Sequence, residues 1–129
     1  MKHTTVLIAF AAILLSACHK QTFEEKVIAE VEHFNSKEAP KRLDMYTTFD
    51  SMSYDTQSQT LSYYYTLGGG IDASMFPVDP VKQELLNNLR NSLPLKAHKD
   101  HNLNFHYIYI SEVSGESVID CIFTPEEYK

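Results

Sequence analysis

Basic residues are scarce in this sequence of 129 residues, which has 11 lysines and arginines against 17 aspartates and glutamates. The formal charge of −6 would repel a polyanion, so nucleic-acid binding is excluded. Disorder is excluded as well, because 43% apolar and 12% aromatic residues provide ample surface to bury. The composition and length predict one small, mildly acidic globular domain.

The common signatures of envelope hydrolases are also missing. The sequence contains no G-x-S-x-G, S-x-x-K or H-E-x-x-H motif. The run Gly68-Gly69-Gly70 lacks the lysine and the immediate helix of a phosphate-binding loop, and we interpret it as a flexible exit from a strand. We therefore expect a protein that is not an enzyme and has no cofactor.

No hydrophobic run is long enough for a permanent transmembrane helix. The longest, Val6 to Leu15, would rise about 15 Å as a helix, which is half of a hydrocarbon core of about 30 Å. Lys2 precedes the run and the small residues Ser16 and Ala17 follow it. This arrangement is typical of a signal peptide.

The segment Leu15-Ser16-Ala17-Cys18 resembles the lipobox of bacterial lipoprotein precursors. The resemblance implies that signal peptidase II removes residues 1–17 and that Cys18 carries diacylglycerol and further acyl chains such as palmitate. Two or three chains would hold the protein on a lipid bilayer. In that family, a residue other than Asp after the cysteine, here His19, implies the outer membrane. The alternative is an ordinary secretory signal with a chance cysteine.

Cleavage would leave residues 18–129, a single domain of 112 residues with charge −7, because Lys2 is lost and all 17 acids remain. Residues 18–21 would form a very short tether. Cys121 would then be a lone thiol. Strand alternation puts Cys121 on a core face and His106 on the opposite face, so we expect a buried hydrophobe and no cysteine nucleophile.

Two helices are predicted from caps and apolar spacing. Thr22 and Glu25 form a capping box before an apolar stripe, which predicts a helix over residues 23–35. Asp79 is a potential N-cap before Pro80, and leucines four apart continue until Pro94. We expect these helices to cover a sheet.

Two hairpins are predicted from period-two alternation. The first spans residues 45–67 and is broken by a polar cluster at residues 55–59. The second joins residues 103–110 to 118–123 through a loop in which Gly115 takes the left-handed position. The expected register places Phe105 opposite Phe123, Tyr107 opposite Cys121, Tyr109 opposite Ile119, and Glu112 opposite Glu116.

The element order therefore predicts an α+β fold of two layers, helix-hairpin-helix-hairpin, with a four-stranded antiparallel sheet. The odd-numbered strand residues, which are largely aromatic and aliphatic, are the expected core. The opposite face is mixed and carries Tyr64, His106, Ile108 and Ile110.

One cluster could bind a metal ion. His98, Asp100 and His101 offer nitrogen and oxygen ligands of the kind that zinc and copper accept. The segment follows Pro94 and leads into a strand, so we interpret it as a polar loop without a metal. The tyrosines of the strands could stack on a sugar or peptide, although β-propensity and core filling also explain them.

Residues 44–129 are similar to small uncharacterised bacterial lipoproteins, through Tyr63-Tyr64-Tyr65-Thr66, Leu95-Lys96 and the segment from Phe123 to Tyr128. We interpret the chain as a membrane-anchored envelope lipoprotein, non-enzymatic, whose mixed sheet face binds a protein or a small ligand in the periplasm. The first alternative is a metal-binding or enzymatic envelope protein centred on His98, Asp100 and His101. The second is a purely structural role close to the membrane.

Overall fold

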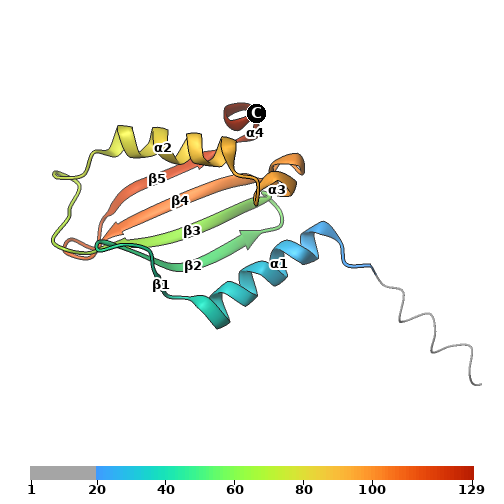
Figure 1. Ribbon diagram of the computed structural model, residues 1–129, viewed down its shortest axis with the longest axis horizontal. Coiled ribbons are helices and arrows are strands. Elements are labelled where there is room, and N and C mark those ends of the chain that lie inside the picture. Colours follow the sequence, from blue (N-terminus) through green and yellow to red (C-terminus); the bar gives the residue numbers. More distant parts are fainter. Residues whose placement is uncertain (1–19) are drawn as a thin grey trace, which may run out of the picture.

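The computed structural model describes residues 20–129, and the predicted signal peptide and Cys18 lie outside this range. The elements, in chain order, are α1 (Phe23–His33), η2 (Phe34–Glu38), β1 (Lys41–Arg42), β2 (Thr47–Asp55), β3 (Thr60–Leu67), α2 (Val78–Asn91), α3 (Lys96–Asp100), β4 (Asn104–Ser111), β5 (Ser117–Phe123) and α4 (Pro125–Tyr128). Figure 1 shows the sheet with α1 along one side and α2 along the other.

The sheet is five-stranded and mixed, with the order β1-β2-β3-β4-β5 and a parallel pair between β3 and β4. The predicted four-stranded antiparallel sheet is therefore wrong on two counts. After β3, α2 carries the chain back to the end where β3 began, so β4 runs in the same direction as β3 (Figure 1). The missed strand, β1, has only two residues, too few to produce an alternation signal.

The predicted register of the β4–β5 hairpin is confirmed. Tyr107 lies opposite Cys121, and its neighbours pair as expected from Phe105 to Tyr109. Gly115 has φ +71°, the left-handed conformation that the turn needs. The tip differs from the prediction, because a bulge after Tyr109 pairs Ile110 with Ser117 and removes the juxtaposition of two glutamates.

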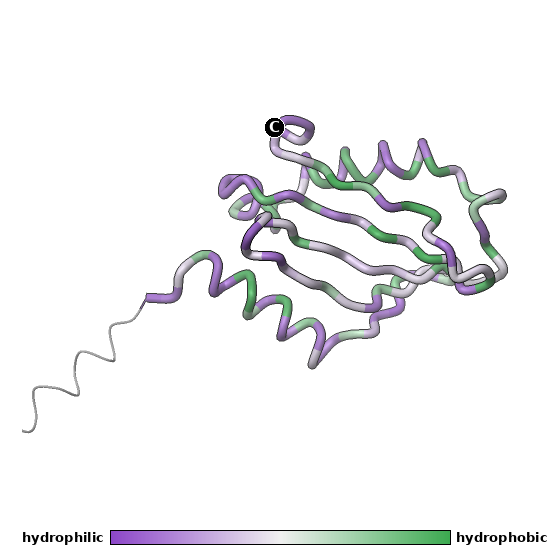
Figure 2. The backbone as a smooth tube through the Cα atoms, turned by 180° about the vertical axis from the view of Figure 1, so that it is seen from behind, coloured by the Kyte–Doolittle hydropathy of each residue, from purple (hydrophilic) through white to green (hydrophobic). Residues whose placement is uncertain are grey.

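Helix α1 begins where the sequence predicts. The Thr22 hydroxyl accepts from the Glu25 backbone N–H at 3.1 Å, and the Glu25 carboxylate accepts from the Thr22 N–H at 3.2 Å. The helix then continues as a π-helical segment through Glu38. Helix α2 begins two residues earlier than predicted, at Val78 instead of Pro80, and without a side-chain cap from Asp79. Figure 2 shows hydrophobic and hydrophilic residues alternating along both helices.

The core lies between the two long helices and the odd-numbered face of β3, β4 and β5, as the alternation predicts. Val27 of α1 and Leu89 of α2 are almost completely buried against this face, and so is Phe105 at its centre. The opposite face of the sheet contributes no residue to the core cluster. We call it the open face, because within residues 20–129 the core residues of the helices all pack against the other face.

Candidate functional site

Four tyrosines line the middle of the helix-side face. The parallel register aligns Tyr63 with Tyr107 and Tyr65 with Tyr109. The rings stack in these pairs, with centroids 5.1 Å and 4.4 Å apart and interplanar angles of 13° and 15°. We call these four residues the tyrosine row.

Two phenylalanines extend the tyrosine row toward α1. The ring of Phe49 stacks on Tyr65 with centroids 4.7 Å apart, and Phe34 of η2 stacks on Phe49 at 4.2 Å. A continuous aromatic layer thus runs across β4, β3 and β2. Its stacking stabilises the face and fixes the orientation of each phenol ring.

The hydroxyl groups of the tyrosine row have no partner among the described residues. Within residues 20–129, no hydrogen bond involves the hydroxyl of Tyr63, Tyr65, Tyr107 or Tyr109, whereas the hydroxyls of Tyr64 and Tyr128 are both bonded. In the same range the only fully buried side-chain atom without a partner is Nδ1 of His98. The four hydroxyls are not among these fully buried atoms, so each keeps some contact with solvent, although Tyr63, Tyr65 and Tyr107 are only 7–9% exposed.

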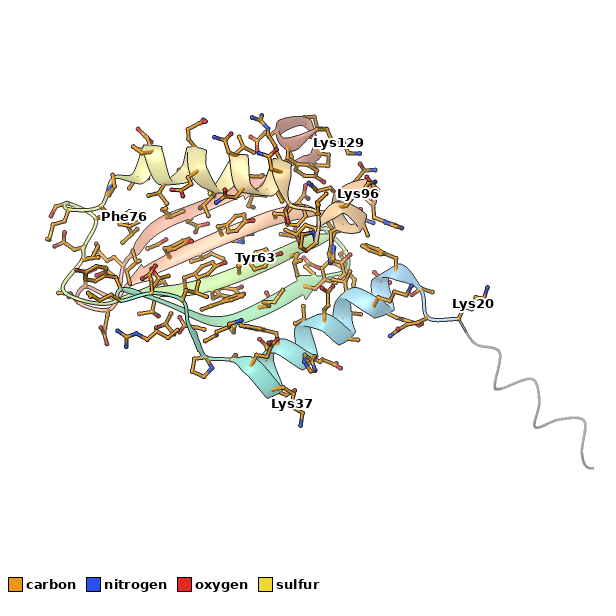
Figure 3. The ribbon with its side chains drawn as sticks, viewed as in Figure 1. Lys20, Lys37, Tyr63, Phe76, Lys96 and Lys129 are labelled. Carbon is orange, nitrogen blue, oxygen red and sulfur yellow. The ribbon has the colours of Figure 1, made fainter. Side chains whose placement is uncertain are left out.

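The arrangement of the helices explains how the hydroxyls reach solvent. Helix α1 packs along β2 and α2 packs along β5, so the two central strands, which carry the tyrosine row, lie between the helices. Figure 3 shows Tyr63 in this position, on the strands between α1 and α2. The row therefore offers stacked rings with hydroxyl tips, framed by a helix on each side.

Burial keeps these phenols neutral. It raises the pKa of Tyr63, Tyr65 and Tyr107 well above the ordinary value of 10, and the neighbouring phenols raise it further. Burial, with a smaller effect of Cys121, raises the pKa of Tyr109 to about 12. At neutral pH the row can donate and accept hydrogen bonds, but it supplies no phenolate nucleophile.

Cys121 lies on the same face, opposite Tyr107, and is 9% exposed. Burial raises the pKa of its thiol, and His106 lies on the opposite face. The structure therefore agrees with the expectation that the two residues do not meet. A protonated, buried thiol is a packing group.

In the structure, His98, Asp100 and His101, the residues of the metal hypothesis, each contact a different partner. Asp100 accepts from the Lys96 ammonium at 2.6 Å, while Nε2 of His98 lies 2.8 Å from the Glu30 carboxylate. His101 stacks on the ring of Phe23, with centroids 3.7 Å apart. The described part of the chain contains no group of three potential ligands placed for a metal ion. The segment forms the short helix α3 instead of the predicted loop.

Sequence reasoning missed a polar chain on the open face. Ser62 Oγ lies 3.3 Å from Nδ1 of His106, and Nε2 of His106 lies 2.5 Å from the Asp120 carboxylate. Ser62 aligns with His106 only because β3 and β4 are parallel, whereas His106 and Asp120 are diagonal neighbours in the β4–β5 hairpin. Ser62 lies within a central strand whose neighbours on both sides engage its backbone, so no pair of amides is free to stabilise an oxyanion beside it.

The membrane prediction at the N-terminus is outside the described residues, so lipidation of Cys18 stays a prediction. None of the helices between Lys20 and Lys129 combines the length and the apolar character that a bilayer crossing requires.

The fold is shared with three solved structures. A protein of Pseudomonas aeruginosa described as secreted matches with a TM-score of 0.67 and 9% identity, over 86% of this chain and 98% of that one. The pilotin EpsS from the Vibrio vulnificus type 2 secretion system matches with a TM-score of 0.63 and 9% identity, over 81% and 89% of the chains. The type II secretion system pilotin AspS from Vibrio cholerae gives 0.60 and 12%, over 79% and 88%.

No curated protein matches the sequence. A family model does match it, over residues 22–119, which include α1, α2, the strands β1 to β4 and the start of β5. This range covers most of the chain and ends within β5. The chain therefore belongs to the family of the domain of unknown function DUF8479.

Proposed function

We propose that this protein is a lipid-anchored, non-enzymatic interaction module of the bacterial cell envelope, and that it binds a segment of a partner protein over the tyrosine row. The anchor is acylated Cys18, and the outer membrane is the proposed location because His19 follows the cysteine. The partner segment would lie between α1 and α2.

The observation that carries the proposal is the set of four unpartnered hydroxyls on an ordered aromatic layer. Tyrosine is enriched in protein interfaces because one rigid side chain combines a large apolar surface with a polar tip. Here the rings are already fixed by stacking, so a partner would cost little additional side-chain entropy. No group within residues 20–129 bonds these hydroxyls, so a partner that reached them could supply the missing hydrogen bonds.

The open face, on which the sequence-based hypothesis placed the binding site, is less suited to this role. Its polar side chains bond to one another: Tyr64 with Ser53 at 3.2 Å, and Thr66 with Asp50 at 2.5 Å. Ser62, His106 and Asp120 form a third set of side chains that bond to one another. A partner on this face would have to replace bonds that already exist.

The fold supports the same class of function. Two proteins of the same fold are pilotins of type 2 secretion systems. A pilotin-like role would have the anchored domain hold another envelope protein, and such a role needs a binding face and no catalytic group. We propose that the partner is a protein component of an envelope assembly.

The test compares the double variant Y65F/Y109F with Y64F. Full-length, lipidated protein is purified with its partners from the native envelope, and each captured protein is quantified. Loss of two interface hydrogen bonds at about 1 kcal/mol each should weaken capture of the true partner by about 30-fold. Y64F removes a hydroxyl from the neighbouring position on the opposite face, and capture should stay unchanged.

The stability of the variants provides the control. Tyr65 and Tyr109 make no hydrogen bond within the described chain, so their phenylalanine variants should unfold within about 0.5 kcal/mol of the wild type. Equal capture by wild type and Y65F/Y109F, or loss of capture in Y64F alone, would contradict binding at the tyrosine row.

A further inference from the structure

The strand β5 forms an unprotected edge of the sheet. It is the last strand in the order, and within residues 20–129 no other strand lies on its outer side. Apart from its ladder with β4, its backbone makes one hydrogen bond in this range, from the Ser117 hydroxyl to the Ile119 carbonyl at 3.2 Å. Within residues 20–129, the other outward N–H and C=O groups of this strand of seven residues have no hydrogen-bond partner.

The opposite edge of the sheet is guarded. Strand β1 pairs with the first residues of β2, at Thr48 and Phe49. Farther along, the Asn35 amide donates to the Met52 carbonyl and accepts from the Met52 N–H, both at 2.8 Å. The side chain thus substitutes for a neighbouring strand.

Proteins usually protect an exposed edge with lysine, proline or a covering segment. Strand β5 contains neither residue, and its only charged side chain, Asp120, is bonded to His106. Ile122, beside it on the open face, is 48% exposed. The edge therefore has the properties of a site where another strand can pair.

A pocket of about 500 Å³ lies between α2, the end of β5 and α4. Leu86 of α2 and Phe123 at the end of β5 supply its apolar lining. Glu126 and Glu127 of α4 border it as well. An added strand would thus contact α2 on one face, and α4, which follows β5 directly, would limit its length at one end.

The charges of this region favour a basic occupant. Asp79, Glu126 and Glu127 line the pocket against Lys82 and Arg90, and the Arg90 guanidinium donates to the Glu127 carbonyl at 2.5 Å and 3.2 Å. The whole chain carries a formal charge of −6, so two copies repel each other overall.

We propose that the β5 edge binds an extended segment of a partner protein by strand addition, and that this segment alternates apolar and basic side chains. The backbone of the segment pairs with the free groups of β5. Its apolar side chains face Leu86 and Phe123, and its basic side chains face the surrounding carboxylates. This site is separate from the tyrosine row and does not depend on the function proposed for that row.

The test uses a peptide of seven residues with blocked ends and alternating valine and lysine, titrated into isotope-labelled domain and followed by amide chemical shifts. We expect the shifts to be confined to residues 117–123 and to the pocket side of α2. A second peptide, with proline at its centre, has the same charge but cannot pair along its length, and it should bind at least about tenfold more weakly.

Ile122→Lys places a charge on the edge strand and should weaken binding at least about tenfold. Ile110→Lys is the matched control, because it adds the same charge to the same face on the interior strand β4, at a residue that is 37% exposed. It should change binding less than about twofold. Equal weakening by both variants, equal binding of both peptides, or shifts centred on the tyrosine row would overturn the proposal. Dimerisation in sedimentation that Ile122→Lys abolishes would identify a second copy as the occupant and would also overturn it.

Discussion

Replacing Asn35 by alanine should release the outer edge of β2 and lower the free energy of unfolding. The Asn35 amide makes two hydrogen bonds of 2.8 Å with the backbone of Met52, beside the bulge at Asp50. A typical hydrogen bond contributes about 0.5–1.5 kcal/mol net, so the loss should be about 1–3 kcal/mol. Because Asn35 itself is exposed, water can replace part of the interaction, and we expect a value in the lower half of this range.

Asn35→Asp tests the donor and the acceptor separately. The carboxylate can still accept from the Met52 N–H, but it cannot donate to the Met52 carbonyl and repels it. The aspartate variant should therefore be at least as unstable as the alanine variant at pH 7. Below about pH 4 the protonated carboxyl regains a donor, so the difference from wild type should shrink.

Urea denaturation of the purified domain measures both variants, with Asn91→Ala as the control. Asn91 donates only to the Asn87 carbonyl of its own helix, and its replacement should change stability by less than about 0.5 kcal/mol. Equal stability of Asn35→Ala and wild type would refute the conclusion that this side chain guards the edge.

Three further outcomes are expected. Phe105→Ala should cost about 3–5 kcal/mol in urea denaturation, because the side chain is fully buried at the centre of the core, whereas Ile122→Ala, at an exposed position, should cost less than about 1 kcal/mol. Stability should fall as the pH rises above about 10, because the unfolded tyrosines ionise there, whereas burial raises the pKa of Tyr109 in the folded protein to about 12. Phenolate absorbance from the tyrosine row should accordingly appear together with loss of near-ultraviolet circular dichroism, and its appearance in the folded protein near pH 10 would show that the row is not buried. Cys18→Ser should leave a larger, unacylated precursor by mass spectrometry, and an unchanged mass would argue against lipidation.

The local features of the fold could be predicted because each depends on residues close in sequence. The capping box of Thr22 and Glu25 needs only a spacing of three residues. The register of β4 and β5 from Phe105 to Tyr109 follows from the apolar residues that both strands place on one face, since a slip by one residue would move them to the other face. Period-two alternation also identified the core face, because burial on one side of a strand is recorded in its own residues.

The direction of β4 relative to β3 could not be predicted in this way. Both hairpins have the same local pattern whether the strands between them run parallel or antiparallel. The choice depends on the path of α2 across the sheet, and therefore on packing between Leu89 and residues distant in sequence. The contact between Ser62 and His106 was missed for the same reason.

The sequence by itself determined the likeness of its N-terminus to a lipobox, its two long helices and the residues of its core. These properties depend on composition, on short motifs and on periodicity, all of which are local. Only the tertiary structure decided that Tyr63 and Tyr65 stack on Tyr107 and Tyr109 between two helices, that one sheet edge is guarded by Asn35, and that the other is open. Such properties are set by strand order and helix placement, which form when distant segments pack against each other.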